Sequence, residues 1–147
     1  MKLNERLLDI EQYTGEGYRP LIDFGSWRVA FLRYIDELIP WNITRVERHI
    51  ETDEVFVLLE GQAVLFLGGG KEGVEDLEPV TMEPGKLYNV KCNAWHTIVL
   101  SHDATILLVE NQDTGPANTE YSTLCEAHKK LIVNTARHEQ RGEWDAA

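Results

Sequence analysis

The most constraining feature of this chain is a series of short apolar and β-branched segments separated by turns rich in glycine and proline. Segments of this composition are typical of β-strands. They occupy residues 26–35, 43–50, 55–61, 62–70, 80–90, 96–100 and 104–111. Gly61 separates the third segment from the fourth, and Pro84 with Gly85 interrupts the fifth. Many short strands at this spacing predict an all-β sandwich or barrel.

The C-terminal segment has a different pattern and predicts a helix. Within residues 123–141 the apolar positions recur at helical spacing, and Thr123 with Glu126 three residues later has the form of a capping box. We expect this helix to lie on a barrel formed by residues 26–122. Residues 1–18 mix charges with a few apolar side chains and predict either a short helix or an extended lead-in. The length of 147 residues, with no internal repeat or linker, predicts one domain.

The charge of the chain argues against two classes of partner. A formal net charge of -11 is unfavourable for nucleic acid and for an anionic membrane surface, both of which need clustered Lys and Arg. The two cysteines, Cys92 and Cys125, have no spacing typical of a zinc site or a disulfide framework. The N-terminal stretch is polar and lacks the apolar core of a signal peptide. We therefore expect a soluble cytoplasmic protein that binds a small molecule.

Charged and imidazole side chains interrupt two of the predicted strands. Glu47 and His49 lie two positions apart in the 43–50 segment, so they leave the same face of a strand, as does Arg45. Glu54 follows a short turn, and His96 begins a later strand. Such side chains are costly to bury unless they are paired, hydrogen-bonded or bound to a ligand. If the two hairpins face each other inside a barrel, these residues converge on one site.

The spacing of this set resembles the two motifs of the cupin superfamily, a family of small jelly-roll barrels. The first motif corresponds to Glu47-x-His49-x4-Glu54-x6-Gly61, and the second to Gly85-x5-Lys91-x-Asn93-x2-His96-x3-Leu100. In the family pattern the first position is a histidine, and the positions of Lys91, Asn93 and Leu100 hold Pro, Gly and Asn. The resemblance implies an all-β, cupin-type double-stranded β-helix, to which the chain adds its C-terminal helix.

The resemblance also implies a divalent metal, because cupins typically hold one with three His and one Glu. The matching ligands here are His49, Glu54 and His96, and Glu47 stands in the place of the first His of the first motif. Two imidazoles and a carboxylate suit Mn, Zn, Fe or Ni. The alternative is a barrel without a metal, in which these polar residues bind a ligand or one another.

A narrower resemblance is to ureidoglycolate lyase, which splits ureidoglycolate into glyoxylate and urea. The residues that carry it are Glu47, Arg48, His49, Gly61, Asn93, Trp95, His96, Asp113 and Gly115. That family has an amide at the position of Glu54 and a His near the position of Lys91. The resemblance implies that His49, His96 and Glu54 are catalytic. It implies that the substrate contacts Arg45, Glu47, Tyr88, Lys91 and Trp95.

Two other functions remain compatible with these residues. One is a cupin without catalytic activity that binds a small sugar or carboxylic acid as a sensor, and the other is a metal-dependent dioxygenase-type cupin. Metal content and activity toward ureido acids separate the three possibilities. The family resemblance further suggests a homodimer.

Overall fold

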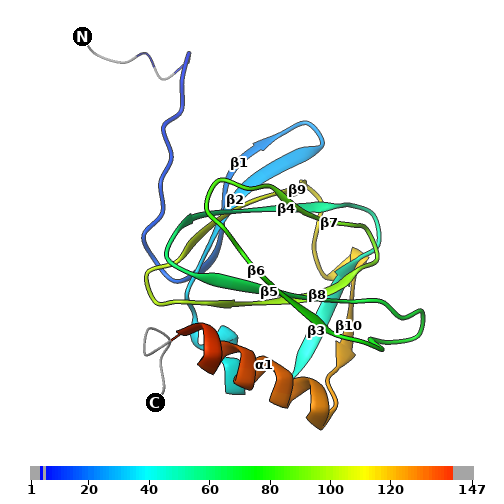
Figure 1. Ribbon diagram of the computed structural model, residues 1–147. Helices are drawn as coiled ribbons and strands as arrows, with labels where there is room; N and C mark the ends of the chain where they lie inside the picture. The colour runs from blue at the N-terminus through cyan, green and yellow to red at the C-terminus, as the bar shows by residue number, and fades with distance from the viewer. Residues whose placement is uncertain (1–3, 5, 141–147) are drawn as a thin grey trace.

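The computed structural model describes residue 4 and residues 6–140, which form two facing antiparallel sheets and one helix (Figure 1). The first sheet has the order β1-β2-β9-β4-β7. Its strands are β1 (Gly17–Phe24), β2 (Trp27–Arg33), β9 (Thr105–Asn111), β4 (Glu54–Glu60) and β7 (Tyr88–Val90). The second sheet has the order β10-β3-β8-β5-β6. Its strands are β10 (Thr119–Thr123), β3 (Arg45–His49), β8 (Trp95–Leu100), β5 (Ala63–Gly68) and β6 (Glu78–Thr81).

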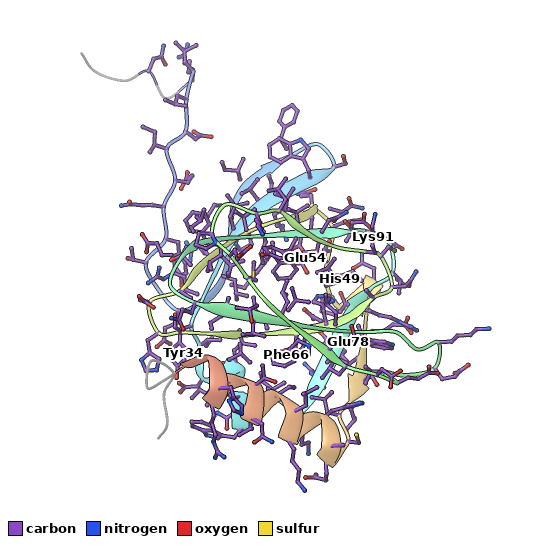
Figure 2. The ribbon with its side chains drawn as sticks, in the orientation of Figure 1. Tyr34, His49, Glu54, Phe66, Glu78 and Lys91 are labelled. Atoms are coloured by element: carbon purple, nitrogen blue, oxygen red, sulfur yellow. The ribbon has the colours of Figure 1, made fainter. Side chains whose placement is uncertain are left out.

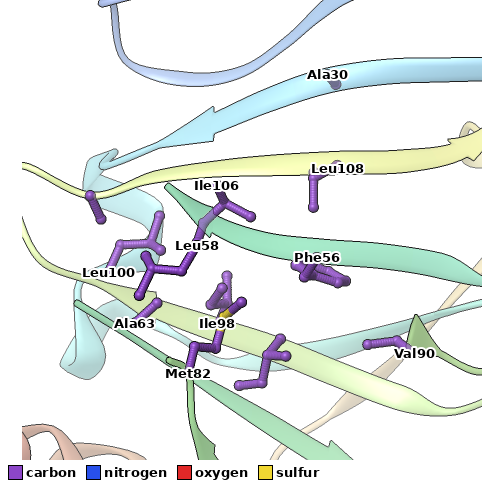
Figure 3. Packing of buried hydrophobic residues seen from close by; sticks show 12 residues of the cluster. Ala30, Phe56, Leu58, Ala63, Met82, Val90, Ile98, Leu100, Ile106 and Leu108 are labelled. Atoms are coloured by element: carbon purple, nitrogen blue, oxygen red, sulfur yellow. The ribbon is translucent and has the colours of Figure 1, made fainter. Parts of the chain in front are cut away.

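The main core lies between the two sheets (Figure 3). Alternate residues of each strand point inward, as the two-residue period of a strand requires. Phe56 and Leu58 of β4 meet Ile106 and Leu108 of β9 in this layer, and all are at most 3% exposed. Ile98 of β8 closes the layer from the opposite sheet. This core fixes the distance between the two sheets. It therefore also fixes how far the polar residues of one sheet lie from those of the other.

A second core lies between the β10-β3-β8-β5-β6 sheet and helix α1 (Glu126–Gln140). Phe66 of β5 and Val99 of β8 point out of the barrel and pack with Ile132 and Ala136 of α1, and all four are at most 2% exposed. Figure 1 shows the helix crossing the outer side of this sheet. The predicted helix is confirmed, and so is the all-β class of the rest of the chain.

Two short connections require residues that accept a left-handed backbone. Gly61, between β4 and β5, has φ +75, and a Cβ there would lie 2.6 Å from the Cα of Ala104. Asn93, which precedes β8, has φ 70. Asn tolerates this region better than other residues with a side chain, so it replaces the glycine of the cupin pattern at this position. The turn at Gly61 leads into β5, which carries core residues, and the turn at Asn93 leads into β8, which carries His96.

The structure differs from the sequence interpretation near both ends of the chain. Residues 6–16 form a turn at residues 6–7 and then neither helix nor strand, and β1 follows at Gly17, where no strand was expected. The helix begins at Glu126 because Thr123 is the last residue of β10, paired with Arg45. The capping box from Thr123 was therefore wrong. Residue 141, the expected helix end, lies outside the described residues.

Three short 3-10 turns complete the connections: Asp36–Leu38, Pro40–Asn42 and Pro116–Asn118. The first two carry the chain from β2 to β3, and the third leads from β9 into β10. Among the described residues, no helix has the length and apolar character that a membrane crossing needs.

Candidate active site

The predicted polar residues meet between the two sheets, at one end of the barrel. His49 is the last residue of β3, and Glu54 is the first residue of β4. Glu47 of β3 pairs directly with His96 of β8, so these two side chains lie on the same inner face. Figure 2 shows Glu54 and His49 approaching each other across the gap between the sheets. The expected convergence of the two hairpins therefore occurs.

The distances within this group are short and nearly symmetrical. The Glu54 Oε1 atom lies 3.2 Å from His49 Nε2 and 3.2 Å from His96 Nε2. The Glu47 Oε1 atom lies 3.9 Å from each of the same two nitrogens. The side chain of Glu54 is 6% exposed, whereas that of Glu47 is 41% exposed. Glu54 is thus the buried carboxylate that holds both imidazoles, and Glu47 lies on their solvent side.

The hydrogen bonds of the two rings assign different roles to their nitrogens. His96 Nδ1 lies 3.0 Å from the carbonyl oxygen of Ala94, so this nitrogen carries the proton and donates. Its Nε2 is buried and not aligned for a hydrogen bond, which leaves a lone pair directed into the site. His49 Nε2 does bond to Glu54 Oε1, and its Nδ1 lies 3.0 Å from Thr119 Oγ1.

Burial and charge act in opposite directions on these groups. Burial lowers the pKa of His49 and of His96, but the contact with the Glu54 carboxylate outweighs it, so both pKa values are raised. Burial alone would raise the pKa of Glu54, yet the hydrogen bond from His49 and the close imidazole of His96 hold it well below its usual range. Glu54 is therefore ionised at neutral pH, and each imidazole holds its proton more strongly than in water.

Glu110 is a site residue that the sequence interpretation missed. It lies near the end of β9 with 6% exposure, and it accepts a hydrogen bond of 2.5 Å from the Tyr18 hydroxyl. Burial, followed by the hydrogen bond and the charge of Glu54, raises the pKa of Glu110 to about 8. The signal was present in the sequence: Ile106 and Leu108 are core residues, so the alternation of the strand directs Glu110 to the same inner face.

The site opens into a cavity of about 860 Å³ that extends between the sheets toward β3 and β10. Among the described residues that line it, Arg45 carries the only Lys or Arg side chain. The Arg45 guanidinium lies 3.8 Å from the centre of the Tyr121 ring. The acidic residues of the lining are Asp36, Glu37, Glu47, Glu54 and Glu110. The cavity lining therefore holds more carboxyl groups than basic side chains, and the Arg45 guanidinium is available for an anionic group of a ligand.

The remaining three predicted substrate contacts lie outside the cavity lining. Trp95 precedes His96 on β8, so strand alternation sends it to the opposite face, where it donates from Nε1 to Gly70 O at 2.9 Å. Arg48 stacks on its ring at 4.2 Å. Tyr88 packs against the main core, and its hydroxyl accepts a hydrogen bond from the backbone N–H of Glu83. Lys91 is exposed beyond the end of β7 (Figure 2).

The donor set fits a divalent metal. Ligand atoms bound to one ion at about 2.1 Å are separated from each other by about 3.0–3.4 Å in octahedral or tetrahedral geometry. The separations of 3.2 Å from Glu54 to both imidazole nitrogens are of this size. The lone pair of His96 Nε2 has no hydrogen-bond partner, and its Nδ1 proton is anchored on a carbonyl, the arrangement that orients metal-binding histidines. Glu47 is a fourth possible ligand.

Comparison with solved structures identifies the architecture. An RmlC-like cupin family protein with a double-stranded β-helix fold, from Methanocaldococcus jannaschii, matches 71% of this chain and 91% of its own at a TM-score of 0.50 and 13% identity. This chain has the cupin fold. The cupin barrel is also similar to the nucleoside dehydratase Pac13, with a TM-score of 0.53 and 11% identity over 80% of this chain and 88% of that one.

Sequence comparison gives a narrower and shorter match. The chain is 36% identical over 63 residues to ureidoglycolate lyase 2 of Rhizobium meliloti (strain 1021). The match covers 42% of this chain and 39% of that protein, so it spans less than half of either. No protein-family model matches the chain. The comparisons thus establish the fold and a partial likeness to the lyase. The reaction has to be inferred from the residues of the site.

Proposed function

We propose that this cupin is a lyase that cleaves a small ureido carboxylic acid such as ureidoglycolate. The observation that supports this most directly is the buried arrangement of Glu54 between the Nε2 atoms of His49 and His96, at 3.2 Å from each. The partial likeness to ureidoglycolate lyase 2 points to the same chemistry. Cytoplasmic location stays a prediction, as does the homodimer.

The reaction needs one proton acceptor and one proton donor. In ureidoglycolate the hydroxyl proton leaves, the C–N bond breaks, the hydroxyl carbon becomes the aldehyde carbon of glyoxylate, and the urea nitrogen takes up a proton. In its neutral form His96 suits the acceptor, because Nδ1–H is held by Ala94, Nε2 faces the site, and the raised pKa makes this nitrogen a stronger base. His49 suits the donor, because the bond to Glu54 favours its protonated form.

Charge in the cavity suits a substrate with both an anionic end and N–H donors. The Arg45 guanidinium is placed to receive the substrate carboxylate, an arrangement that fixes orientation as well as charge. Glu47, which is half exposed beside the two imidazoles, can accept hydrogen bonds from the ureido N–H groups. Alternatively, a divalent ion held by the Nε2 atoms of His49 and His96 and by Glu54 would supply Lewis acidity toward the hydroxyl or carboxylate oxygen, and the two imidazoles would then serve as ligands in place of proton donor and acceptor.

A direct assay tests this proposal. Purified protein, with and without added Mn²⁺ or Zn²⁺, is incubated with ureidoglycolate, and glyoxylate release is measured. We expect release above the uncatalysed rate, and a loss of about 10²–10⁴-fold in kcat for His96→Gln, because a positioned acid or base contributes about this much. The matched control is His138→Gln, an exposed histidine of α1. No release under any of these metal conditions refutes the lyase proposal.

The size of the cavity favours a second candidate function. Small-molecule sites commonly have volumes of about 300–1,000 Å³, and a cavity of about 860 Å³ has room for a sugar or nucleoside besides a two-carbon ureido acid. Structures of the similar protein Pac13 were determined with uridine. Calorimetric titration with uridine and with simple sugars tests this alternative, and tight binding without glyoxylate release would favour it over the lyase.

A further inference from the structure

The wall of the cavity that β3 and β10 form carries polar side chains beside the two imidazoles. These strands are antiparallel neighbours (Figure 1), and their register pairs His49 with Thr119 and Glu47 with Tyr121. Directly opposite residues point to the same face of a sheet, so the Tyr121 ring lies on the cavity side next to Glu47. Arg45, two residues before Glu47, shares that face. Tyr121 and Arg45 therefore line the cavity one step beyond the imidazoles.

Arg45 lacks a carboxylate partner of the kind that its neighbour Arg48 has. On the outer side of the same strand, Arg48 bonds to Glu120 at 3.1 Å. Within residue 4 and residues 6–140, Arg45 forms no ion pair, although five acidic residues line the same cavity. Its guanidinium instead lies over the Tyr121 ring, 3.8 Å from the ring centre. The charge of Arg45 is therefore available to a ligand.

The Tyr121 ring can hold this guanidinium without blocking its hydrogen-bond donors. The face of an aromatic ring attracts a cation, and Arg stacks on such faces. The five N–H groups of a guanidinium lie in its plane, so a ring against its flat side leaves the edge open to a carboxylate, which binds there through two parallel hydrogen bonds. Without the ring, the long Arg45 side chain would be drawn toward Glu47, which leaves the same face of β3 two residues away.

We infer that Tyr121 is a positioning residue for the anion-binding group of this site, because its ring holds the Arg45 guanidinium free for a substrate carboxylate. The inference rests on the proposed function and adds to it the group that sets the charge of the substrate. Arg45 has the one Lys or Arg side chain of the described cavity lining. The site therefore selects acids with a single carboxylate and an uncharged remainder that is rich in N–H groups.

The acidic lining excludes a second negative charge. A second carboxylate on the substrate would come near Glu47 or near Asp36 and Glu37, and the described lining offers no second Lys or Arg to receive it. Like charges brought together across a binding site are strongly unfavourable. We expect N-carbamoylaspartate, which has two carboxylates, to bind at least about tenfold more weakly than N-carbamoylglycine, which has one.

A binding experiment on the full chain tests the inference without any turnover. N-carbamoylglycine has the ureido group and the carboxylate of ureidoglycolate but lacks the hydroxyl, so the cleavage reaction cannot occur, and N-carbamoylglycinamide is its neutral counterpart. Each compound is titrated into isotope-labelled protein, and NMR shifts give the dissociation constants. Tyr121→Leu should weaken binding of the acid about 3- to 10-fold, through loss of the cation–ring contact, and leave binding of the amide unchanged. Tyr121→Phe keeps the ring and should bind the acid as the wild type does.

Steady-state kinetics with ureidoglycolate give a second readout. Because the substitution leaves both imidazoles and Glu54 in place, Tyr121→Leu should raise KM by the same factor and leave kcat unchanged. A general loss of structure would lower kcat as well. The matched control is Tyr13→Leu, which removes a ring 5.6 Å from the Arg19 guanidinium, outside the cavity lining, and should change neither constant.

The Tyr121 side chain is 46% exposed on the edge strand β10, so its variants should fold. If circular dichroism shows that Tyr121→Leu is unfolded, Tyr121→Thr takes its place, because Thr is suited to strands. Acid binding by the folded variant that equals wild-type binding overturns the inference, as does an equal loss in Tyr121→Phe. A wild type that binds the acid no more tightly than the amide also overturns it. A preference for the acid that depends on Tyr121, without glyoxylate release, supports the inference and refutes the lyase proposal alone.

Discussion

Substitution of Glu54 by Gln should destabilise the protein in a pH-dependent way. The change keeps the shape of the side chain and removes the charge that holds the two imidazoles. At pH 6, where the histidines are protonated, one aligned hydrogen bond to a charged group contributes about 1.5–3 kcal/mol. The second imidazole lies at the same 3.2 Å without alignment and adds a smaller Coulomb contribution. We therefore expect Glu54→Gln to lower the free energy of unfolding by about 2–4 kcal/mol at this pH.

The sign of the pH dependence follows from the raised pKa values of His49 and His96. A group whose pKa is raised on folding contributes stability that is fully present below its unfolded value, about 6.5 for His, and that is lost as the pH rises through the folded value. Above the raised folded pKa values both rings are neutral, and the effect of Glu54→Gln should fall to about 1 kcal/mol, the contribution of a neutral hydrogen bond.

Urea unfolding in the presence of EDTA, monitored by tryptophan fluorescence, measures this difference between pH 6 and pH 9. The matched control is Glu47→Gln, which removes the same charge from a 41% exposed side chain 3.9 Å from the same two nitrogens. Solvent screening limits its effect to below about 1 kcal/mol at either pH. A loss for Glu54→Gln that does not change with pH, or equals that of Glu47→Gln, would refute the assignment of Glu54 as the buried partner of both imidazoles.

Three further predictions concern the turn, the second carboxyl group and the metal. Gly61→Ala should lower the free energy of unfolding by about 1–2 kcal/mol because of its left-handed backbone, and by more because the new Cβ clashes with Ala104. Gly25→Ala, with φ +56 and open space around it, should lower it by the backbone contribution alone. Thermal unfolding compares the two variants. The pKa of Glu110 is raised to about 8, so its ionisation lowers the free energy of unfolding of the wild type as the pH rises from about 5 to 8. Because Gln does not titrate, the stability of Glu110→Gln relative to the wild type should increase over this pH range, as measured by urea titration. Mn²⁺ or Zn²⁺ at about 100 times its dissociation constant should stabilise the wild type by about 2.7 kcal/mol in calorimetric scans, and the double variant of His49→Ala and His96→Ala should show no such shift.

The sequence predicted that His49, Glu54 and His96 come together, because strand alternation and motif spacing agreed. The two-residue period places Glu47 and His49 on one face of β3, and the pairing of Glu47 with His96 brings β8 to the same face. The same two-residue period places Trp95 and Arg48, the neighbours of the inner residues, on the outer face. Trp95 is therefore next to His96 in the sequence but lies outside the site.

Other features depend on tertiary packing that no local pattern contains. The position of β10 beside β3 and of β1 beside β2 could not be read from residues 17–24 and 119–123, because these edge strands are mostly exposed and carry mixed polar residues. The contact between Glu54 and Glu110 joins β4 to β9, and its effect on the pKa of Glu110 arises only when both carboxyl groups are buried together.

Arg48 stacks on Trp95 on the outer side of β3 and β8, the two strands whose inner side carries the candidate site. The outer residues of these strands hold the structure together, and the inner residues form the site. Arg48 also donates to the carbonyl oxygens of Gly70 and Lys71 at 3.1 Å, and Trp95 shares the first of these acceptors, so three segments are tied together outside the barrel. The inner positions of these strands can therefore exchange side chains while the frame stays in place. Glu47→His would offer a metal ion three imidazoles and one carboxylate on the same scaffold. This barrel would therefore allow two ligand sets for a metal to be compared within one backbone.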